Sequence, residues 1–381
     1  MERDRGLRMP FDVYPKEVRA QPLPPPPPVP IWKTWKGVIG GAILILAIIG
    51  AIVGIVVSTG AKKSKIPEAS GAAGTSSNGT VAALGGAGVA AVSWPSNGQQ
   101  VRLYIQKDDG FVYEAASDQN GYWNPNMTQL FRAKAGTPLA AVVPAPSQVH
   151  LYYLDTSNIL QEYIYNNSWT KGATPLPSTN IAPITSLAAT TWTDSSSVLN
   201  IRLYYQKQDN TIQELAYSTG SGWSSGYSFT DQAYPGAGLG AFATYFDEAL
   251  STGVYWQGND LNVHEYIYAS SWSTNLFKWS ATPSSGITAI GWQDTSSDGP
   301  QVRVYYENTD RSVEEVSYSY SSGWTMKVPL NTLVDIPAPI SATVWVSGGD
   351  VEARIYVKNN SSNIHIEITY SGGWTSKVLS F

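Results

Sequence analysis

The sequence predicts an all-β fold, a six-bladed β-propeller over residues 84–381, preceded by a disordered tail and one transmembrane α-helix. A pattern of short alternating segments closed by a Trp recurs with a period of about 50 residues, which is typical of propeller blades. Six such units fill the chain after residue 83, so they form one ring. A single long uncharged stretch lies ahead of them. The closing residues are Trp123, Trp169, Trp223, Trp272, Trp324 and Trp374, at steps of 46, 54, 49, 52 and 50.

The first 83 residues divide into three segments. Residues 1–36 are polar, of mixed charge, and contain an unbroken Pro run, which predicts a disordered, Pro-rich tail. Residues 37–57 carry no charge over 21 positions. Such a helix spans roughly 30 Å, the thickness of the hydrocarbon core, so we expect an uncleaved membrane anchor. Residues 58–83 are rich in small and polar side chains and predict a flexible stalk.

Charge around the anchor predicts its orientation. Seven Lys or Arg precede residue 37 and three follow residue 57 before Arg102, although the two sides nearly tie close to the membrane. The excess favours a cytosolic N-terminus with the large domain outside, a type II single-pass membrane protein. Gly50 and Gly54 form a GxxxG pair that suits helix dimerisation. A dimer is therefore one option, and the sequence leaves the oligomeric state open.

Composition excludes several classes of function. The net charge is −5 and no basic field runs through the chain, which argues against nucleic-acid binding. There is no Cys, so the chain has neither disulfides nor thiolate metal sites. The three His fall in strands of different repeats, and we expect no metal and no other cofactor. The 14 Trp and 23 Tyr suit either sheet packing or platforms for a flat ligand.

An Arg recurs in the second predicted strand of four repeats and a Glu in the third strand of all six. In repeats one, three and five the two residues are 12 positions apart, and we interpret them as directly opposite each other in an antiparallel pair, with Cβ atoms roughly 5 Å apart. The sixth repeat has a spacing of 13. The second and fourth repeats carry His150 and Gly253 instead of Arg. The pairs are Arg102 with Glu114, Arg202 with Glu214, Arg303 with Glu315, and Arg354 with Glu367.

Such a pair can be a plain salt bridge, worth about 0–1 kcal/mol when exposed. Its recurrence together with a closing Trp favours binding instead. A guanidinium and a carboxylate can together donate to and accept from vicinal hydroxyls, and an indole face packs against the apolar side of a sugar. A second Trp set, which ends the first strand, and the Tyr two positions after each Arg are interpreted as packing residues. These are Trp94, Trp192, Trp292 and Trp345, with Tyr104, Tyr204, Tyr305 and Tyr356.

The joint motif resembles that of the fungal fucose-specific lectins of the Aleuria type over residues 84–381. The resemblance implies a non-catalytic propeller that binds L-fucose between adjacent blades, without a metal or cofactor, with fucosylated glycans or glycoproteins as partners. It also implies weak or silent pockets at His150 and Gly253. The residues it assigns to carbohydrate binding are Arg102, Glu114, Trp123, Arg202, Glu214, Trp223, Arg303, Glu315, Trp324, Arg354, Glu367 and Trp374.

Two rival interpretations stay open at this point. A glycoside hydrolase needs one pair of carboxylates about a single bond, whereas these groups are copied around a ring. A propeller that has lost sugar binding and serves as a scaffold for protein interaction fits the two degraded repeats.

Overall fold

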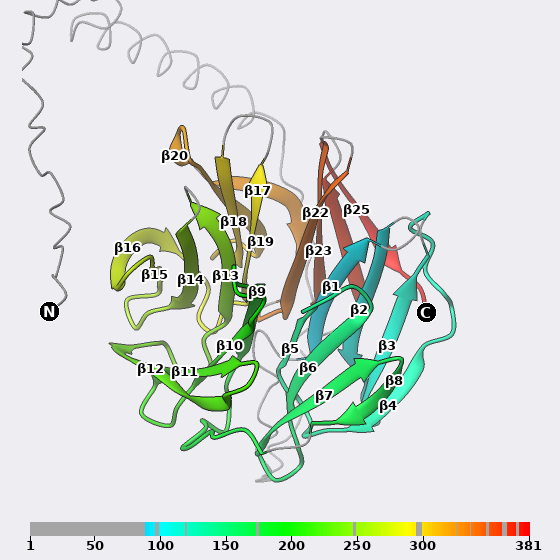
Figure 1. Cartoon of the computed structure of the whole chain (residues 1–381). Coiled ribbons are helices and arrows are strands. Elements are labelled where there is room, and N and C mark those ends of the chain that lie inside the picture. The colour runs from blue at the N-terminus through cyan, green and yellow to red at the C-terminus, as the bar shows by residue number, and fades with distance from the viewer. Residues whose placement is uncertain are drawn as a thin grey trace, which may run out of the picture. The chain divides into compact units, whose positions relative to one another are not determined.

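The computed structural model describes residues 88–95, 99–118, 120–172, 175–246, 249–294, 299–325, 327–335, 337–347, 350–359, 364–370 and 373–381. These residues form 25 strands in six antiparallel sheets, and the predicted six-bladed β-propeller is confirmed (Figure 1). The predicted tail, the transmembrane helix at residues 37–57 and the stalk lie outside the described residues. Within the described ranges, no helix is long and apolar enough to cross a membrane.

Each blade corresponds to one sequence repeat, including the two weak copies. Blade 1 contains β1 (Val89–Pro95), β2 (Gln99–Gln106), β3 (Phe111–Ser117) and β4 (Thr128–Arg132). Blade 2 contains β5 (Leu139–Val142), β6 (Gln148–Leu154), β7 (Leu160–Asn166) and β8 (Ser168–Lys171). Blade 3 contains β9 (Leu187–Thr193), β10 (Leu199–Gln206), β11 (Thr211–Ser218) and β12 (Gly222–Gln232).

The second half of the ring has the same plan. Blade 4 contains β13 (Leu239–Phe246), β14 (Ala249–Gln257), β15 (Asn262–Tyr268) and β16 (Trp272–Ser280). Blade 5 contains β17 (Ile287–Asp294), β18 (Gly299–Glu307), β19 (Ser312–Ser319), β20 (Gly323–Trp324) and β21 (Val328–Leu333). Blade 6 contains β22 (Ile340–Ser347), β23 (Asp350–Asn359), β24 (Ile364–Tyr370) and β25 (Trp374–Leu379).

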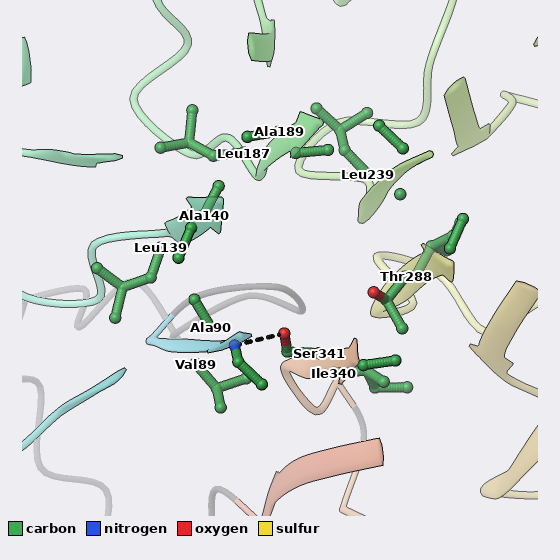
Figure 2. A pocket seen from close by; sticks show the side chains of 18 residues that line it. Val89, Ala90, Leu139, Ala140, Leu187, Ala189, Leu239, Thr288, Ile340 and Ser341 are labelled. Atoms are coloured by element: carbon green, nitrogen blue, oxygen red, sulfur yellow. Dashed lines mark hydrogen bonds between the residues drawn. The ribbon is translucent and has the colours of Figure 1, made fainter. Parts of the chain in front are cut away.

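The first strand of every blade lies innermost and the later strands follow outward as a meander (Figure 1). The six inner strands converge on a narrow axial cavity, where Figure 2 shows Ala90, Ala140 and Ala189 together with larger apolar residues such as Leu139 and Leu187. One Ala per blade lines both the narrow cavity of 70 Å³ and the wider one of 350 Å³ that share this axis. The six residues are Ala91, Ala141, Ala189, Ala241, Ala289 and Ala342.

Hydrophobic packing between neighbouring blades holds the ring together. The buried apolar residues fall into six clusters, and each cluster draws its members from two adjacent blades. The cluster between blades 6 and 1 joins Tyr356 and Leu379 to Leu103 and Ile105. Two polar contacts between inner strands β1 and β22 add to this closure: the Ala91 N–H donates to Ser341 Oγ at 2.8 Å, and the Ser93 and Thr343 hydroxyls lie 2.6 Å apart.

Candidate functional site

The middle hairpin of each blade places its Glu opposite a Tyr. In blade 1 the register pairs Tyr104 with Glu114 and Arg102 with Ala116. The prediction that Arg and Glu lie directly opposite each other is therefore wrong, because the hairpin turns one residue later than the midpoint between them. Arg and Glu are diagonal neighbours on one face of the sheet, a separation that long side chains bridge. The same register holds in blade 6, where Tyr356 pairs with Glu367, so its extra residue is absorbed by the loop.

The Tyr–Glu pair is the constant part of the site. The Tyr is fully buried in every blade, at 0% exposure. In five blades its hydroxyl donates to the Glu carboxylate, at 3.1 Å for Tyr104, 3.0 Å for Tyr152 and Tyr204, 2.5 Å for Tyr255 and 3.1 Å for Tyr356. The expectation that these Tyr only pack is thus incomplete, because they also fix the position of the carboxylates.

The Trp that ends the first strand supports the Arg of its own blade. The guanidinium carbon lies over the indole at 5.0 Å in blade 1, 4.8 Å in blade 3, 4.9 Å in blade 5 and 5.0 Å in blade 6. A cation–π contact of this kind contributes about 0.5–2 kcal/mol. The expectation that Trp94, Trp192, Trp292 and Trp345 only pack in the core missed this role. The sequence held a signal for it, because Arg and Trp are absent together from blades 2 and 4, where Pro144 and Thr244 take the Trp position.

Backbone carbonyls orient the guanidinium in blades 1, 3 and 5. The Nη1 of Arg202 donates to the carbonyls of Ile201 at 3.0 Å and Tyr217 at 3.4 Å, and Arg102 and Arg303 make the equivalent bonds. The Nε then faces the Glu at 3.9, 3.7 and 3.8 Å in the three blades, which is longer than a hydrogen bond. Among the described residues, Nη2 has no hydrogen-bond partner, so this edge is open to a ligand.

The closing Trp of each blade packs against the site of the preceding blade. It stands near the start of the fourth strand, except that Trp123 lies ahead of β4. In blades 1 and 5 the indole meets the Tyr edge-on: Trp169 meets Tyr104 at 5.8 Å, and Trp374 meets Tyr305 at 6.1 Å. In the same way Trp123 of blade 1 reaches Tyr356 of blade 6 at 5.8 Å. In blade 3 the ring of Phe229 contacts both Tyr204, at 6.2 Å, and Trp272, at 4.9 Å. Of the predicted residues, Trp223 and Trp324 therefore belong to the blade 2 and blade 4 sites, which lack Arg. The blade 1 and blade 3 sites are completed instead by Trp169 and Trp272, two closing Trp residues that were not predicted as binding residues.

The blade 5 site shows these parts around one cavity. Its volume is 280 Å³, near the lower end for small-molecule pockets and suited to a single sugar ring. Blade 5 supplies the polar groups and the stacked Trp, whereas blade 6 supplies the outer wall. The lining includes Trp292, Gln301, Arg303, Tyr305, Glu315, Val351, Ala353, Tyr370 and Trp374.

Burial sets the acid–base character of these carboxyls. Burial raises the pKa of Glu114, Glu214 and Glu315, and the adjacent Arg opposes the rise in each case. Burial and the neighbouring Glu raise the pKa of Tyr104, Tyr204 and Tyr305 well above the usual value, so these hydroxyls stay protonated.

The blade 6 site has the same residues but a different arrangement. Arg354 Nη1 contacts Glu367 Oε1 directly at 3.1 Å. The other oxygen of Glu367 binds Lys377 Nζ at 2.7 Å and accepts from Trp123 Nε1 at 3.3 Å. The Glu367 side chain is 0% exposed, against 18%, 9% and 12% for Glu114, Glu214 and Glu315. Glu367 is thus satisfied within the protein, whereas the buried Nε of Arg354 has no hydrogen-bond partner among the described residues.

Blades 2 and 4 lack the guanidinium. His150 takes its place in blade 2 and binds Glu162 through Nδ1 at 2.8 Å. In blade 4, a side chain at Gly253 would collide with the ring of Phe242, which fills the space that Arg occupies elsewhere.

The two axial cavities are lined by Ala, Val, Leu, Ile, Gly, Phe, Ser and Thr, and no carboxylate lines them among the residues that the structure describes. Within the part of the chain that the structure describes, no three His, Asp or Glu gather as a metal site would require.

Comparison with known proteins agrees with this site. The sequence profile of a family described as "Fungal fucose-specific lectin" matches residues 84–248 and 191–380, which together make up most of the chain. The chain belongs to the fungal fucose-specific lectin family. As a member of this lectin family it is a carbohydrate-binding protein and not an enzyme.

Curated relatives of this lectin-family chain are themselves fucose-specific lectins. That of Aleuria aurantia is 29% identical over 303 residues, covering 75% of this chain and 93% of the relative. That of Aspergillus fumigatus is 25% identical over 284 residues, covering 72% and 88%.

Solved structures of the lectin family share the fold. The Aleuria aurantia lectin, described as a six-bladed β-propeller with a novel fucose recognition mode, superposes with a TM-score of 0.65 at 25% identity over 77% of this chain and 96% of that one. A variant of the same lectin in complex with α-methyl-L-fucoside gives a TM-score of 0.65 at 26% identity over 77% and 95%.

Proposed function

We propose that this chain is a fucose-binding lectin whose competent pockets lie at blades 1, 3 and 5. The observation that carries the proposal is a repeated unit: an Arg stacked on a Trp, beside a Glu that lies opposite a buried Tyr and accepts its hydroxyl in blades 1 and 3, with a Trp from the next blade packed nearby. Relatives named as fucose-specific lectins support the choice of sugar.

The open groups of this unit match the hydroxyls of a sugar. The free N–H groups of Arg202 can donate to one sugar hydroxyl, and the remaining lone pairs of Glu214 can accept from the adjacent hydroxyl. Two adjacent hydroxyls can therefore bind the Arg and the Glu at the same time. The apolar face of the ring and the methyl group of a deoxy sugar then pack against indole, here Trp272 of the following blade.

The number of strong pockets follows from the ion pairs. In blades 1, 3 and 5 the Arg and Glu are 3.7–3.9 Å apart and each keeps unused hydrogen-bonding capacity. In blade 6 a ligand would have to displace Arg354 or Lys377 from Glu367, and in blade 2 it would meet the shorter His150. We therefore expect three strong sites per chain and weaker binding elsewhere.

The test is calorimetric titration of the full chain, in a detergent without a sugar headgroup, with methyl α-L-fucoside. The expected stoichiometry is three. Arg202→Lys keeps the charge beside Glu214 but loses the planar fork, and should remove one site while the midpoint of thermal unfolding stays unchanged. A chain that binds no fucoside, or that keeps all three sites in the Arg102→Lys, Arg202→Lys, Arg303→Lys triple variant, contradicts the proposal.

The lectin domain is proposed to be held at a membrane by residues 37–57, with a cytosolic tail at residues 1–36 and a stalk at residues 58–83. The uncharged stretch and the excess of Lys and Arg before it support a type II orientation. Carbonate extraction of membranes should leave the chain in the pellet, and protease added outside intact cells should release the lectin domain. Recovery in the soluble fraction would contradict the anchor without touching the sugar-binding proposal.

A further inference from the structure

The blade 4 pocket occupies the place of the sugar pockets but has a different chemistry. It encloses 340 Å³, and its residues stand at the positions that line the blade 5 pocket: Tyr255 and Glu265 match Tyr305 and Glu315, and Trp324 matches Trp374. Five of its eleven lining residues are aromatic. The lining includes Phe242, Phe246, Tyr255, Glu265, Ile267, Asn275, Val302, Tyr318 and Trp324.

Four positions around Phe242 distinguish this pocket from the sugar pockets. Gly253 replaces the Arg, and Phe242 fills the vacated space. Gly291 of blade 5 makes room for the same ring, since a side chain there would also collide with Phe242. Thr244 replaces the Trp on which the Arg would stack. The guanidinium and its platform are thus lost together and an aromatic ring takes their place.

The carboxylate of the site is nevertheless retained. Glu265 is 2% exposed, and it accepts from Tyr255 Oη at 2.5 Å and from Asn275 Nδ2 at 2.5 Å. Glu114, Glu214, Glu315 and Glu367 each have an Arg within 4 Å, whereas among the described residues Glu265 has no cation partner. Burial raises the pKa of Glu265, and the hydrogen bonds from Asn275 and Tyr255 oppose the rise. A cation beside this carboxyl would favour its charged form.

We propose that the blade 4 pocket binds an organic ammonium group, of the quaternary or methylated kind. Five aromatic rings from two blades surround the pocket, namely those of Phe242, Phe246, Tyr255, Tyr318 and Trp324. Aromatic faces attract such cations through the ring quadrupole, most strongly where the contact is desolvated. The ammonium would take the electrostatic place of the missing guanidinium beside Glu265, while its methyl groups would pack against the aromatic rings.

The experiment is calorimetric titration of the full chain, in a neutral polyoxyethylene detergent, with choline. Its uncharged isostere 3,3-dimethylbutan-1-ol is the matched ligand. We expect one choline site per chain, unaffected by saturating methyl α-L-fucoside, and at least tenfold weaker binding of the alcohol. Equal binding of the two would show a merely apolar pocket, and no choline binding would show no site at all. Either result overturns the proposal and leaves the sugar pockets untouched.

Variants locate the site. Glu265→Gln should weaken choline at least tenfold, whereas Glu315→Gln, the same change in the blade 5 pocket, should not. The double variant Phe242→Thr with Gly253→Arg restores the pattern of blade 3, where Thr190 faces Arg202, and should abolish choline binding without altering Glu265 or Trp324. Choline binding that survives both changes would place the ammonium elsewhere and contradict the assignment.

Discussion

At the scale of the residue, the six pockets share the Tyr–Glu pair and differ at the position of the Arg. All six blades keep Tyr opposite Glu, whereas the neighbouring position is Arg in four blades, His150 in one and Gly253 in one. Arg can serve there because its flat cation stacks on indole and still presents several donors along one edge.

Binding of fucoside should weaken in acid. Burial raises the pKa of Glu214 above its usual value, and sugar hydroxyls donate to the ionised form. Bound sugar therefore lowers this pKa, and the affinity is fully present above the raised pKa of the free protein and declines as pH falls through it. Titration at a series of pH values checks this. Loss of affinity toward higher pH would be the contrary result.

Glu307 should make the fold less stable as pH rises. Burial raises its pKa from 4.5 to about 8, although the N–H groups of Ala338 and Gly286 oppose the rise. Its neutral form is favoured in the folded state, so the stability it contributes is complete below pH 4.5 and is lost as pH approaches about 8. Gln206 holds the equivalent position in blade 3 and donates to Tyr234 O at 2.9 Å.

Glu307→Gln is thus expected to raise the free energy of unfolding by about 1–3 kcal/mol at pH 8 and to leave it nearly unchanged at pH 4.5. Urea unfolding at the two pH values measures the difference. An equal effect at both would show that the carboxyl does not titrate in this interval.

At the scale of the element, each pocket is shared by two blades. The inner three strands of one blade carry the stacked Trp, the Arg and the Tyr–Glu pair, and the outermost strand of the next blade brings the closing Trp. A change in one blade therefore acts on the pocket of its neighbour.

Two matched Trp variants separate these assignments. Trp169→Leu lies in blade 2 but should remove the blade 1 site, lowering the fucoside stoichiometry from three to two. Trp223→Leu, the equivalent change in blade 3, borders the His150 site and should leave three. The two Trp hold the same place in the fold, so similar losses of thermal stability are expected. The reverse pattern of stoichiometry would refute the assignment of Trp across blades.

The sequence predicted the repeat and its chemistry better than the geometry of the site. Period, strand patterning and turn residues gave six blades, because these features are local. The register of Arg and Glu failed because the turn lies one residue from the midpoint of their spacing. The origin of the closing Trp was not predictable from the repeat alone, since a periodic sequence does not tell which of two neighbouring units a side chain meets. The joint loss of Arg and Trp in blades 2 and 4 was visible, and it marks the stacked pair.

At the scale of the whole molecule, the ring sets the valence. Apolar clusters join every pair of adjacent blades, so the pockets are fixed on one rigid body. Three pockets on alternate blades can engage clustered glycans with a gain in avidity from effective concentration. On surfaces of increasing fucose density, the wild type should be retained progressively longer. A variant with Arg202→Lys and Arg303→Lys should dissociate at one rate throughout, and density-independent retention of the wild type would contradict multivalency.

The most direct test of the central claim is a crystal structure of the protein with methyl α-L-fucoside. The account predicts sugar at blades 1, 3 and 5, held by Arg102 with Glu114, Arg202 with Glu214, and Arg303 with Glu315, each against the closing Trp of the following blade. Sugar bound elsewhere, or clefts left empty while each guanidinium closes onto its carboxylate, would contradict it.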